Sequence, residues 1–410
     1  MIRSVGFAAY ALIGLTLAAC QSDIGSAPAT PSSTTKTSAT GSGMLTTRTA
    51  PAAVEGREFA TLYNFDPQGK HGARVGLLAI RRDGSAVIVN SPPGVDVETI
   101  AQSQVGVQTG QHRKWFPIQS GSRPREASDA ATYGQTIVWV ETTQAMRASP
   151  DLKVFAVRSG QERPTLLSKS LDLSKSDVIP MSPGGNFITT DGVHVWWVRT
   201  YPTKDPSGWG SQILVRDIAG RGPLAVAIER AKNPVAAKAG LVYLRSPDVD
   251  PKMPANRYEL RLHQGTTDTM LVAGDLVEGE PSSTICASET FIAWAVNSAG
   301  TSSENMQAPA DGRLHVLSLA SKVQQVIELG DNAGGLSLAC GNTFVAWGNG
   351  SGNGDPGQYV FDIPSSKIWK LGELRGYSAV QAAGSILAWA LPPKSTQDAV
   401  SWRVTKWQGR

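Results

Sequence analysis

The stretch Ile137-Val138-Trp139-Val140 decides the fold, because close copies of it recur through the rest of the chain. Each copy is a short apolar segment with a central aromatic residue, and the copies are Val195-Trp196-Trp197-Val198, Leu241-Val242-Tyr243-Leu244, Ile292-Ala293-Trp294-Ala295, Val345-Ala346-Trp347-Gly348 and Leu387-Ala388-Trp389-Ala390. From Trp139 to Trp389 the aromatic residues recur at a mean spacing of about 50 residues. A period of this length indicates an array of similar structural units.

Each unit contains three further short strands around this aromatic one. A strand of small residues and a tight turn precede it, as in Thr284–Ser288. A polar loop and a hairpin of alternating apolar residues follow it, as in Arg313–Leu317 and Gln325–Leu329. Alternation with a period of two and turn residues between the runs are typical of antiparallel strands. Four strands, here named A to D in chain order, in about 50 residues form one blade of a β-propeller.

The number of blades follows from the two ends of the array. Six units are explicit, and Leu77–Ile80, Ala86–Val89, Gln104–Val107 and Lys114–Ile118 supply the four strands of a seventh. The last unit lacks a D strand before the chain ends, and the strand-like run Phe59–Phe65 lies unassigned near its start. We therefore predict an all-β fold with seven four-stranded blades over residues 57–410. The N-terminal strand closes the ring and removes its open edge; six blades are the alternative.

The N-terminus has the form of an export signal. Arg3 precedes an uncharged apolar run, Val5–Leu17, which is too short for a permanent membrane span. The run ends in Leu17-Ala18-Ala19-Cys20, which resembles the lipobox of bacterial lipoproteins. The resemblance implies cleavage of residues 1–19, lipidation of Cys20 and an exported protein anchored to the cell membrane or the outer membrane. An ordinary signal peptide that ends near a cysteine is the alternative.

Residues 20–56 follow as a segment without aromatic residues. Of residues 21–56, 27 of 36 are Ser, Thr, Pro, Ala or Gly. Because such a segment buries too little apolar surface to offset chain entropy, we expect a disordered tether that ends at residue 56.

The repeats also resemble the exported propellers of the broad TolB-like and WD40-like group. Ser149-Pro150-Asp151 and Ser182-Pro183-Gly184-Gly185 are similar to the Ser-Pro-Asp-Gly turns of that group, although the WD dipeptide is missing. The resemblance covers the repeats and no active site. It implies a binding or scaffold protein in most members and an enzyme in some.

The loops between strands B and C are the longest, and strand alternation places them all on one face of the disc. Binding residues concentrate in loops on a rigid scaffold, so this long-loop face is the predicted interaction surface. Tyr201, Asp205 and Trp209 share one loop and are candidates for contact with a sugar or a partner protein. Asp248 and Asp250 in the next loop suggest Ca²⁺, but the glycine and distal glutamate of an EF-type loop are missing, which favours a solvated acidic loop.

Cys286 and Cys340 occupy nearly equivalent A-strand positions in adjacent units. The sequence leaves open whether they form a disulfide, which needs Cα atoms within about 7 Å, or remain two buried thiols.

Charge and motifs limit the classes of function. The 38 basic and 34 acidic residues are too balanced for a nucleic-acid-binding protein on charge alone. No His-Glu-x-x-His or Gly-x-Ser-x-Gly motif occurs in the sequence. We predict a membrane-anchored envelope propeller that binds a protein or glycan and needs no cofactor or metal. The alternative is an envelope hydrolase or lyase with its site at the axial funnel.

Overall fold

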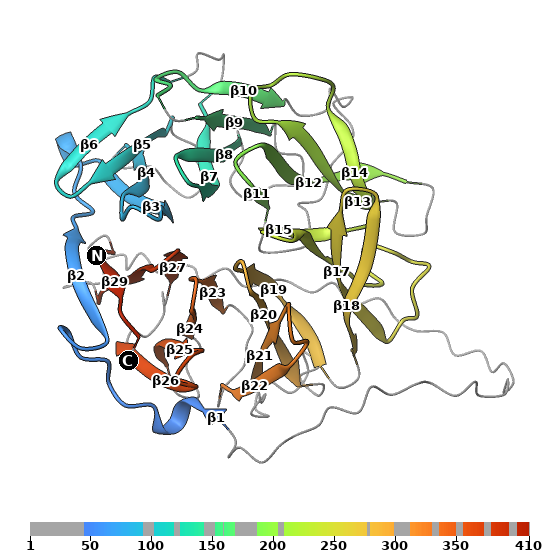
Figure 1. The fold of residues 1–410 in the computed structure, drawn as a ribbon. Helices are drawn as coiled ribbons and strands as arrows, with labels where there is room; N and C mark the ends of the chain where they lie inside the picture. The colour runs from blue at the N-terminus through green and yellow to red at the C-terminus, as the bar shows by residue number, and fades with distance from the viewer. Residues whose placement is uncertain are drawn as a thin grey trace, which may run out of the picture.

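The computed structural model describes residues 45–92, 102–118, 124–142, 152–158, 160–168, 187–203, 209–276, 279–298, 312–329, 336–349, 356–372, 379–392 and 400–409. These residues form seven antiparallel four-stranded sheets arranged in a ring. The A strands surround the axis and the D strands lie on the circumference (Figure 1). The predicted seven-bladed β-propeller is therefore confirmed.

The first four blades follow one another along the chain. Blade 1 comprises β3 (Arg74–Ile80), β4 (Ala86–Ser91), β5 (Gln104–Thr109) and β6 (His112–Trp115). Blade 2 comprises β7 (Glu126–Tyr133), β8 (Thr136–Thr142), β9 (Lys153–Val157) and β10 (Thr165–Ser168). Blade 3 comprises β11 (Ile188–Thr190), β12 (His194–Pro202), β13 (Trp209–Asp217) and β14 (Ala225–Glu229). Blade 4 comprises β15 (Lys232–Ala237), β16 (Gly240–Arg245), β17 (Arg257–Gln264) and β18 (Thr267–Asp275).

The last three blades complete the ring, and the seventh takes its outer strand from the N-terminal side. Blade 5 comprises β19 (Gly279–Ala287), β20 (Phe291–Ser298), β21 (Gly312–Ser318) and β22 (Gln324–Glu328). Blade 6 comprises β23 (Ser337–Cys340), β24 (Phe344–Asn349), β25 (Gly357–Asp362) and β26 (Lys367–Gly372). Blade 7 comprises β27 (Val380–Ala383), β28 (Ile386–Ala390), β29 (Trp402–Trp407) and β2 (Phe59–Phe65).

The closing strand lies where the sequence predicts it. β2 runs antiparallel to β29, with Phe59 opposite Trp407 and Phe65 opposite Trp402. Figure 1 shows the blue β2 beside the red β29, so residues from the two ends of the chain complete one sheet. The Trp407 amide bonds to the Ser385 carbonyl in the A–B turn of blade 7 at 2.8 Å. The chain therefore enters β2 from the face that carries the short A–B turns, called the short-turn face below.

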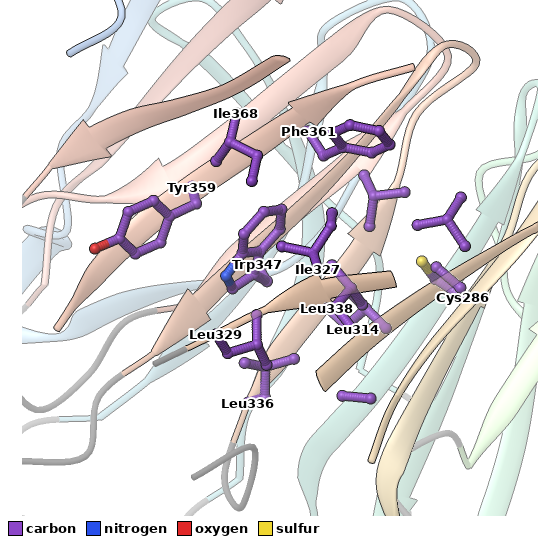
Figure 2. Packing of buried hydrophobic residues seen from close by; sticks show 14 of the residues in the cluster. Cys286, Leu314, Ile327, Leu329, Leu336, Leu338, Trp347, Tyr359, Phe361 and Ile368 are labelled. Atoms are coloured by element: carbon purple, nitrogen blue, oxygen red, sulfur yellow. The ribbon is translucent and has the colours of Figure 1, made fainter. Parts of the chain in front are cut away.

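The aromatic residues that reveal the repeat form the core between blades. Trp139, Trp197, Trp294, Trp347 and Trp389 are all at most 2% exposed. Trp347 of blade 6 packs with Leu314 and Ile327 of blade 5, as Figure 2 shows. Burial of such side chains contributes roughly 25 cal/mol per Å² of apolar surface.

Residues 45–56, which the sequence assigns to a disordered tether, form defined elements in the described structure. β1 (Leu45–Thr46) adds a parallel fifth strand to the outer edge of β22, and Ala52 bridges to Lys370 on β26. Between them lies the 3₁₀ helix η1 (Thr47–Thr49); a second one, η2 (Lys70–Gly72), precedes β3. Thr47 is buried and its hydroxyl donates to the Leu329 carbonyl at 2.8 Å. Residues 45–58 thus form a strap over blades 5 and 6, held largely through backbone groups.

Candidate functional site at the axial channel

A cavity of about 410 Å³ lies on the propeller axis. All seven A strands and six of the seven A–B turns line it, so it opens toward the short-turn face. Each A strand is the end strand of its sheet, and its inner edge therefore has no partner strand within that sheet. The small residues of these strands, such as Ala131 and Ala382, leave room for the cavity where seven blades converge.

Short polar side chains at the inner end of the cavity join neighbouring blades. Asp129 lies opposite Val140 and Ser337 opposite Gly348, in each case the residue after the B-strand tryptophan. Ser337 Oγ accepts a bond from the Val380 amide of blade 7 at 3.1 Å. Asp129 Oδ2 likewise accepts a bond from the Phe187 amide beside blade 3 at 3.3 Å. The same position in the repeat thus carries a neutral hydroxyl in blade 6 and a carboxyl group in blade 2.

The Asp129 carboxyl group is the chemically distinctive residue of the cavity. Burial raises the pKa of Asp129 to about 7, although backbone amides at Phe187, Ala130 and Ile188 act in the opposite direction. Among the described residues no cation forms an ion pair with it. Because a desolvated carboxylate without a counter-charge is costly, this group favours a proton or a cationic ligand.

The mouth of the cavity carries charged residues from opposite sides of the ring. Arg82 of blade 1 reaches Glu289 of blade 5, with the guanidinium nitrogen 3.0 Å from the carboxylate oxygen. Lys238 of blade 4 lies 3.9 Å from the other Glu289 oxygen. The Arg82 guanidinium also lies over the Tyr133 ring of blade 2, 5.6 Å from its centre. These four side chains, called the mouth cluster below, place two cations and one anion across the entrance.

The local turn explains how Arg82 comes to lie over the entrance. The Arg81 amide bonds to the Ser85 carbonyl at 2.9 Å, and Gly84 has a φ of 84°. Only glycine adopts this backbone conformation without strain. A Cβ atom at Gly84 would also lie 2.9 Å from Leu62 of β2. The tight turn therefore projects Arg82 from the end of β3 toward the axis.

The two A-strand cysteines border the same cavity. Cys286 and Cys340 form a disulfide in the structure, with their Cα atoms 5.5 Å apart. Both residues line the channel, Cys286 from β19 and Cys340 from β23. The bond therefore joins blades 5 and 6 at the axis, in addition to the hydrophobic contacts between them in Figure 2.

On the long-loop face, ion pairs hold the two candidate aspartates. Asp250 is 1% exposed and pairs with Arg230 and Arg245, and these arginines help to lower the pKa of Asp250 against the opposing effect of burial. Asp248 pairs with Lys232 at 2.5 Å. The carboxylate oxygens that a calcium ion would need are thus already paired with arginine and lysine side chains. Among the described residues no group of three or more His, Cys, Asp or Glu side chains could hold a metal.

Of the other candidate residues, only Tyr201 has a side chain within the described structure. The Tyr201 hydroxyl donates to Glu229 at 2.9 Å, which fixes the ring at the outer part of blade 3. Trp209 begins β13 opposite Pro202, and its side chain lies outside the described structure, as does Asp205. Cys20 also lies outside the described residues. None of the described helices is long and apolar enough to span a membrane.

The sequence alone does not predict Arg82, Asp129 and Glu289 as residues of a site. Arg82 and Glu289 are 207 positions apart, and only the closed ring brings them together. Asp129 carries one usable signal, because alignment on the B-strand tryptophans puts a carboxyl group where blade 6 has Ser337.

The comparisons with known proteins support the fold. No protein-family model matches the chain, and no curated protein matches it in sequence. An acylaminoacyl peptidase from Pyrococcus horikoshii matches 82% of this chain with 9% identity and a TM-score of 0.54. An orthorhombic crystal form of that peptidase matches 85% with 9% identity and a TM-score of 0.52. The β-propeller domain of the Trilobed protease from Pyrococcus furiosus matches 82% of this chain, and 96% of that domain is covered, with 9% identity and a TM-score of 0.49.

These matches cover only part of the peptidase, and they concern its fold and not its activity. The chain spans 52% and 53% of the two Pyrococcus horikoshii structures, so it corresponds to about half of that peptidase. At 9% identity the likeness concerns the fold alone. The chain is a seven-bladed β-propeller, and its fold is similar to that of about half of the Pyrococcus horikoshii acylaminoacyl peptidase.

Proposed function

We propose that this protein is a lipid-anchored β-propeller of the bacterial cell envelope that binds a ligand in its axial channel. The lipobox-like sequence before Cys20 and the Ser/Thr/Pro/Ala-rich segment after it support the anchor. The observation that supports the binding site is the cavity itself. It combines a desolvated carboxyl group at its inner end with a charged mouth cluster, inside a closed ring.

The channel has stronger support than the long-loop face. On that face the described candidates Tyr201, Asp248 and Asp250 already use their polar groups within the protein. Asp129 faces a cavity instead, and the cavity volume lies in the range of small-molecule sites, about 300–1,000 Å³. A protein or glycan partner on the long-loop face remains a prediction. The envelope hydrolase or lyase also remains one, because the likeness to peptidases concerns the fold alone.

Replacement of the lipidation residue tests the anchor. In cells fed a palmitate analogue, we expect the wild-type protein to carry the label and to fractionate with membranes. Cys20→Ala should lose the label, because position 20 then has no thiol to receive the lipid. A label that persists in Cys20→Ala would contradict the lipoprotein assignment.

Photo-cross-linking in cells tests the binding site. A benzoylphenylalanine in place of Tyr133 lies at the mouth, and one in place of Val323 lies in the C–D turn of blade 5, away from the cavity. We expect a discrete adduct from position 133 that position 323 does not give. Ala382→Trp, which adds bulk at the cavity wall, should abolish the adduct, and Ala382→Ser should retain it. An adduct unchanged by Ala382→Trp would overturn the channel as the binding site.

A further inference from the structure

The two ends of the cavity carry opposite charges. At the inner end lies Asp129, the acidic group without an ionic partner among the described residues. At the mouth lie Arg82 and Lys238, which share one carboxylate, Glu289. A ligand with a cationic group at one end and an anionic group at the other therefore complements this arrangement.

The separation of these charges fits a short extended chain. Asp129 and Tyr133 are four residues apart on β7, which corresponds to about 13 Å at ~3.3 Å per strand residue. The Arg82 and Asp129 side chains shorten the span that a ligand must bridge. A tripeptide in extended form is about 10 Å long by the same rise. A cavity of about 410 Å³ is large enough for such a molecule.

We propose that the channel binds a short peptide with free ends. Its ammonium group pairs with the Asp129 carboxylate, and its terminal carboxylate replaces Glu289 as the partner of Arg82 and Lys238. This inference rests on the proposed function, since it names the ligand class for the same cavity. No covalent step is involved.

The cavity wall between Asp129 and the mouth cluster offers backbone groups that can bond to a peptide. The seven A strands present inner edges without a partner strand, so their backbone groups face the axis. Neighbouring blades already use such groups for bonds to short side chains, as between Thr189 Oγ1 and the Ala236 amide at 3.0 Å. An extended peptide offers the same donors and acceptors at strand spacing.

The Arg82–Glu289 pair is suited to exchange for a ligand carboxylate. The two side chains are 45% and 39% exposed, so water screens their attraction and the pair contributes little to stability. A ligand carboxylate at the entrance therefore replaces Glu289 at small cost. The Tyr133 ring below the guanidinium helps to hold Arg82 in place during the exchange.

Comparison with Ser337 shows that the bond between blades needs no carboxylate. Ser337 makes the equivalent contact with the next blade through a hydroxyl group. Aspartate at this position bears the additional cost of burying an ionisable group. Asp129→Ser should thus preserve the bond to Phe187 and remove only the negative charge.

Other charged groups near Asp129 are few. β7 also carries Glu126, β8 carries Glu141 and β3 carries Arg74 at its far end, whereas β4, β5 and β11 have no charged residue. Arg74 is the one cation of these three residues, and it forms no ion pair with Asp129 among the described contacts. The charge that a ligand ammonium meets at the inner end is therefore that of Asp129.

Calorimetric titration at pH 7.5 tests the proposal with trialanine as the probe. We expect the wild-type protein to bind trialanine, N-acetyl-trialanine to bind at least tenfold more weakly, and trialanine amide to be weakened similarly. Asp129→Ser should lose the discrimination against the N-acetyl form, and Arg82→Gln the discrimination against the amide. Lys114→Gln, an exposed cation on the outer strand β6, is the control and should bind like the wild type.

The outcomes separate the ligand class from the proposed function. Equal affinity for all three peptides, or no effect of Asp129→Ser in a protein with an unchanged melting temperature, would overturn the peptide proposal. If trialanine fails to bind while the position-133 adduct forms and is lost in Ala382→Trp, the channel remains the binding site and the ligand class is wrong. If that adduct also fails to form, the proposed function itself is wrong.

Discussion

Two sides of the ring use the same repeat differently. Blades 5 to 7, called the clamped side here, are joined at the axis by Cys286–Cys340 and by Ser337. Their outer edges are covered by β1, by Ala52 and by the closing strand β2. Blades 2 and 3, the charged side, place Asp129 at the axis, and their outer strands β10 and β14 pair with no further strand among the described residues.

The contacts that close the ring and the buried carboxyl group of the cavity thus lie in different blades. Closure of a propeller needs strong contacts where the chain ends meet, and the clamped side supplies them with a disulfide, a strap and a shared sheet. Among the described residues, the charged side contains none of these contacts. We infer that it accommodates a costly ionisable group because closure does not depend on it.

The largest effect is expected from breaking the closing strand on the clamped side. Phe59 is 4% exposed and packs edge-on against Trp389, with ring centres 5.2 Å apart. Phe59→Ala should lower the free energy of unfolding by about 3–5 kcal/mol, since it leaves a cavity at the junction. Guanidinium denaturation measures this. Leu62→Ala on the same strand, at a side chain 47% exposed, is the control, and an equal loss there would contradict the account.

A similar or slightly smaller effect is expected from removing the disulfide. The bond spans 54 residues, and loss of a crosslink of this length costs about 4 kcal/mol in the chain-entropy model. Cys286→Ala combined with Cys340→Ala should lower stability by this amount under oxidising conditions. A reducing agent should destabilise the wild type and leave the double variant unchanged. A wild type insensitive to reduction would show that the clamp adds nothing.

A still smaller effect on stability is expected from weakening the strap formed by residues 45–58. Thr47→Ala removes the buried hydroxyl bond to Leu329, at a cost of about 1 kcal/mol. Thr49→Ala, at an exposed position in the same 3₁₀ helix, should change stability by less than about 0.5 kcal/mol. Thermal unfolding of the two variants side by side measures the difference. Identical melting temperatures would mean that residues 45–58 do not stabilise the ring.

The fold is largely predictable from sequence because one packing requirement repeats in every blade. The B-strand aromatic residue must fill the space between two blades, so Trp139 to Trp389 mark the period, and the unassigned run Phe59–Phe65 then identifies the closing strand. The strap is not predictable in this way. It is held mainly by backbone bonds, as at Ala53 and Lys370, and these leave little trace in the side chains.

The candidate site is less predictable for a different reason. Its five residues come from four blades of the ring, and no spacing along the chain connects Arg82, Lys238 and Glu289. Alignment of the repeats reveals Asp129 as a carboxyl group in a place that tolerates a hydroxyl. The shape of the cavity and the loss of solvent around that group require the closed ring.

The pH dependence of trialanine affinity, compared between the wild type and Asp129→Ser, tests the central claim most directly. Burial raises the pKa of Asp129 to about 7, so its carboxylate is mostly protonated at pH 5.5 and mostly ionised at pH 7.5. Over that range the peptide keeps its ammonium and carboxylate groups largely charged. We expect wild-type affinity to rise about 20-fold from pH 5.5 to 7.5 and that of Asp129→Ser to stay constant. A flat wild-type profile, or the same rise in both proteins, would contradict the account.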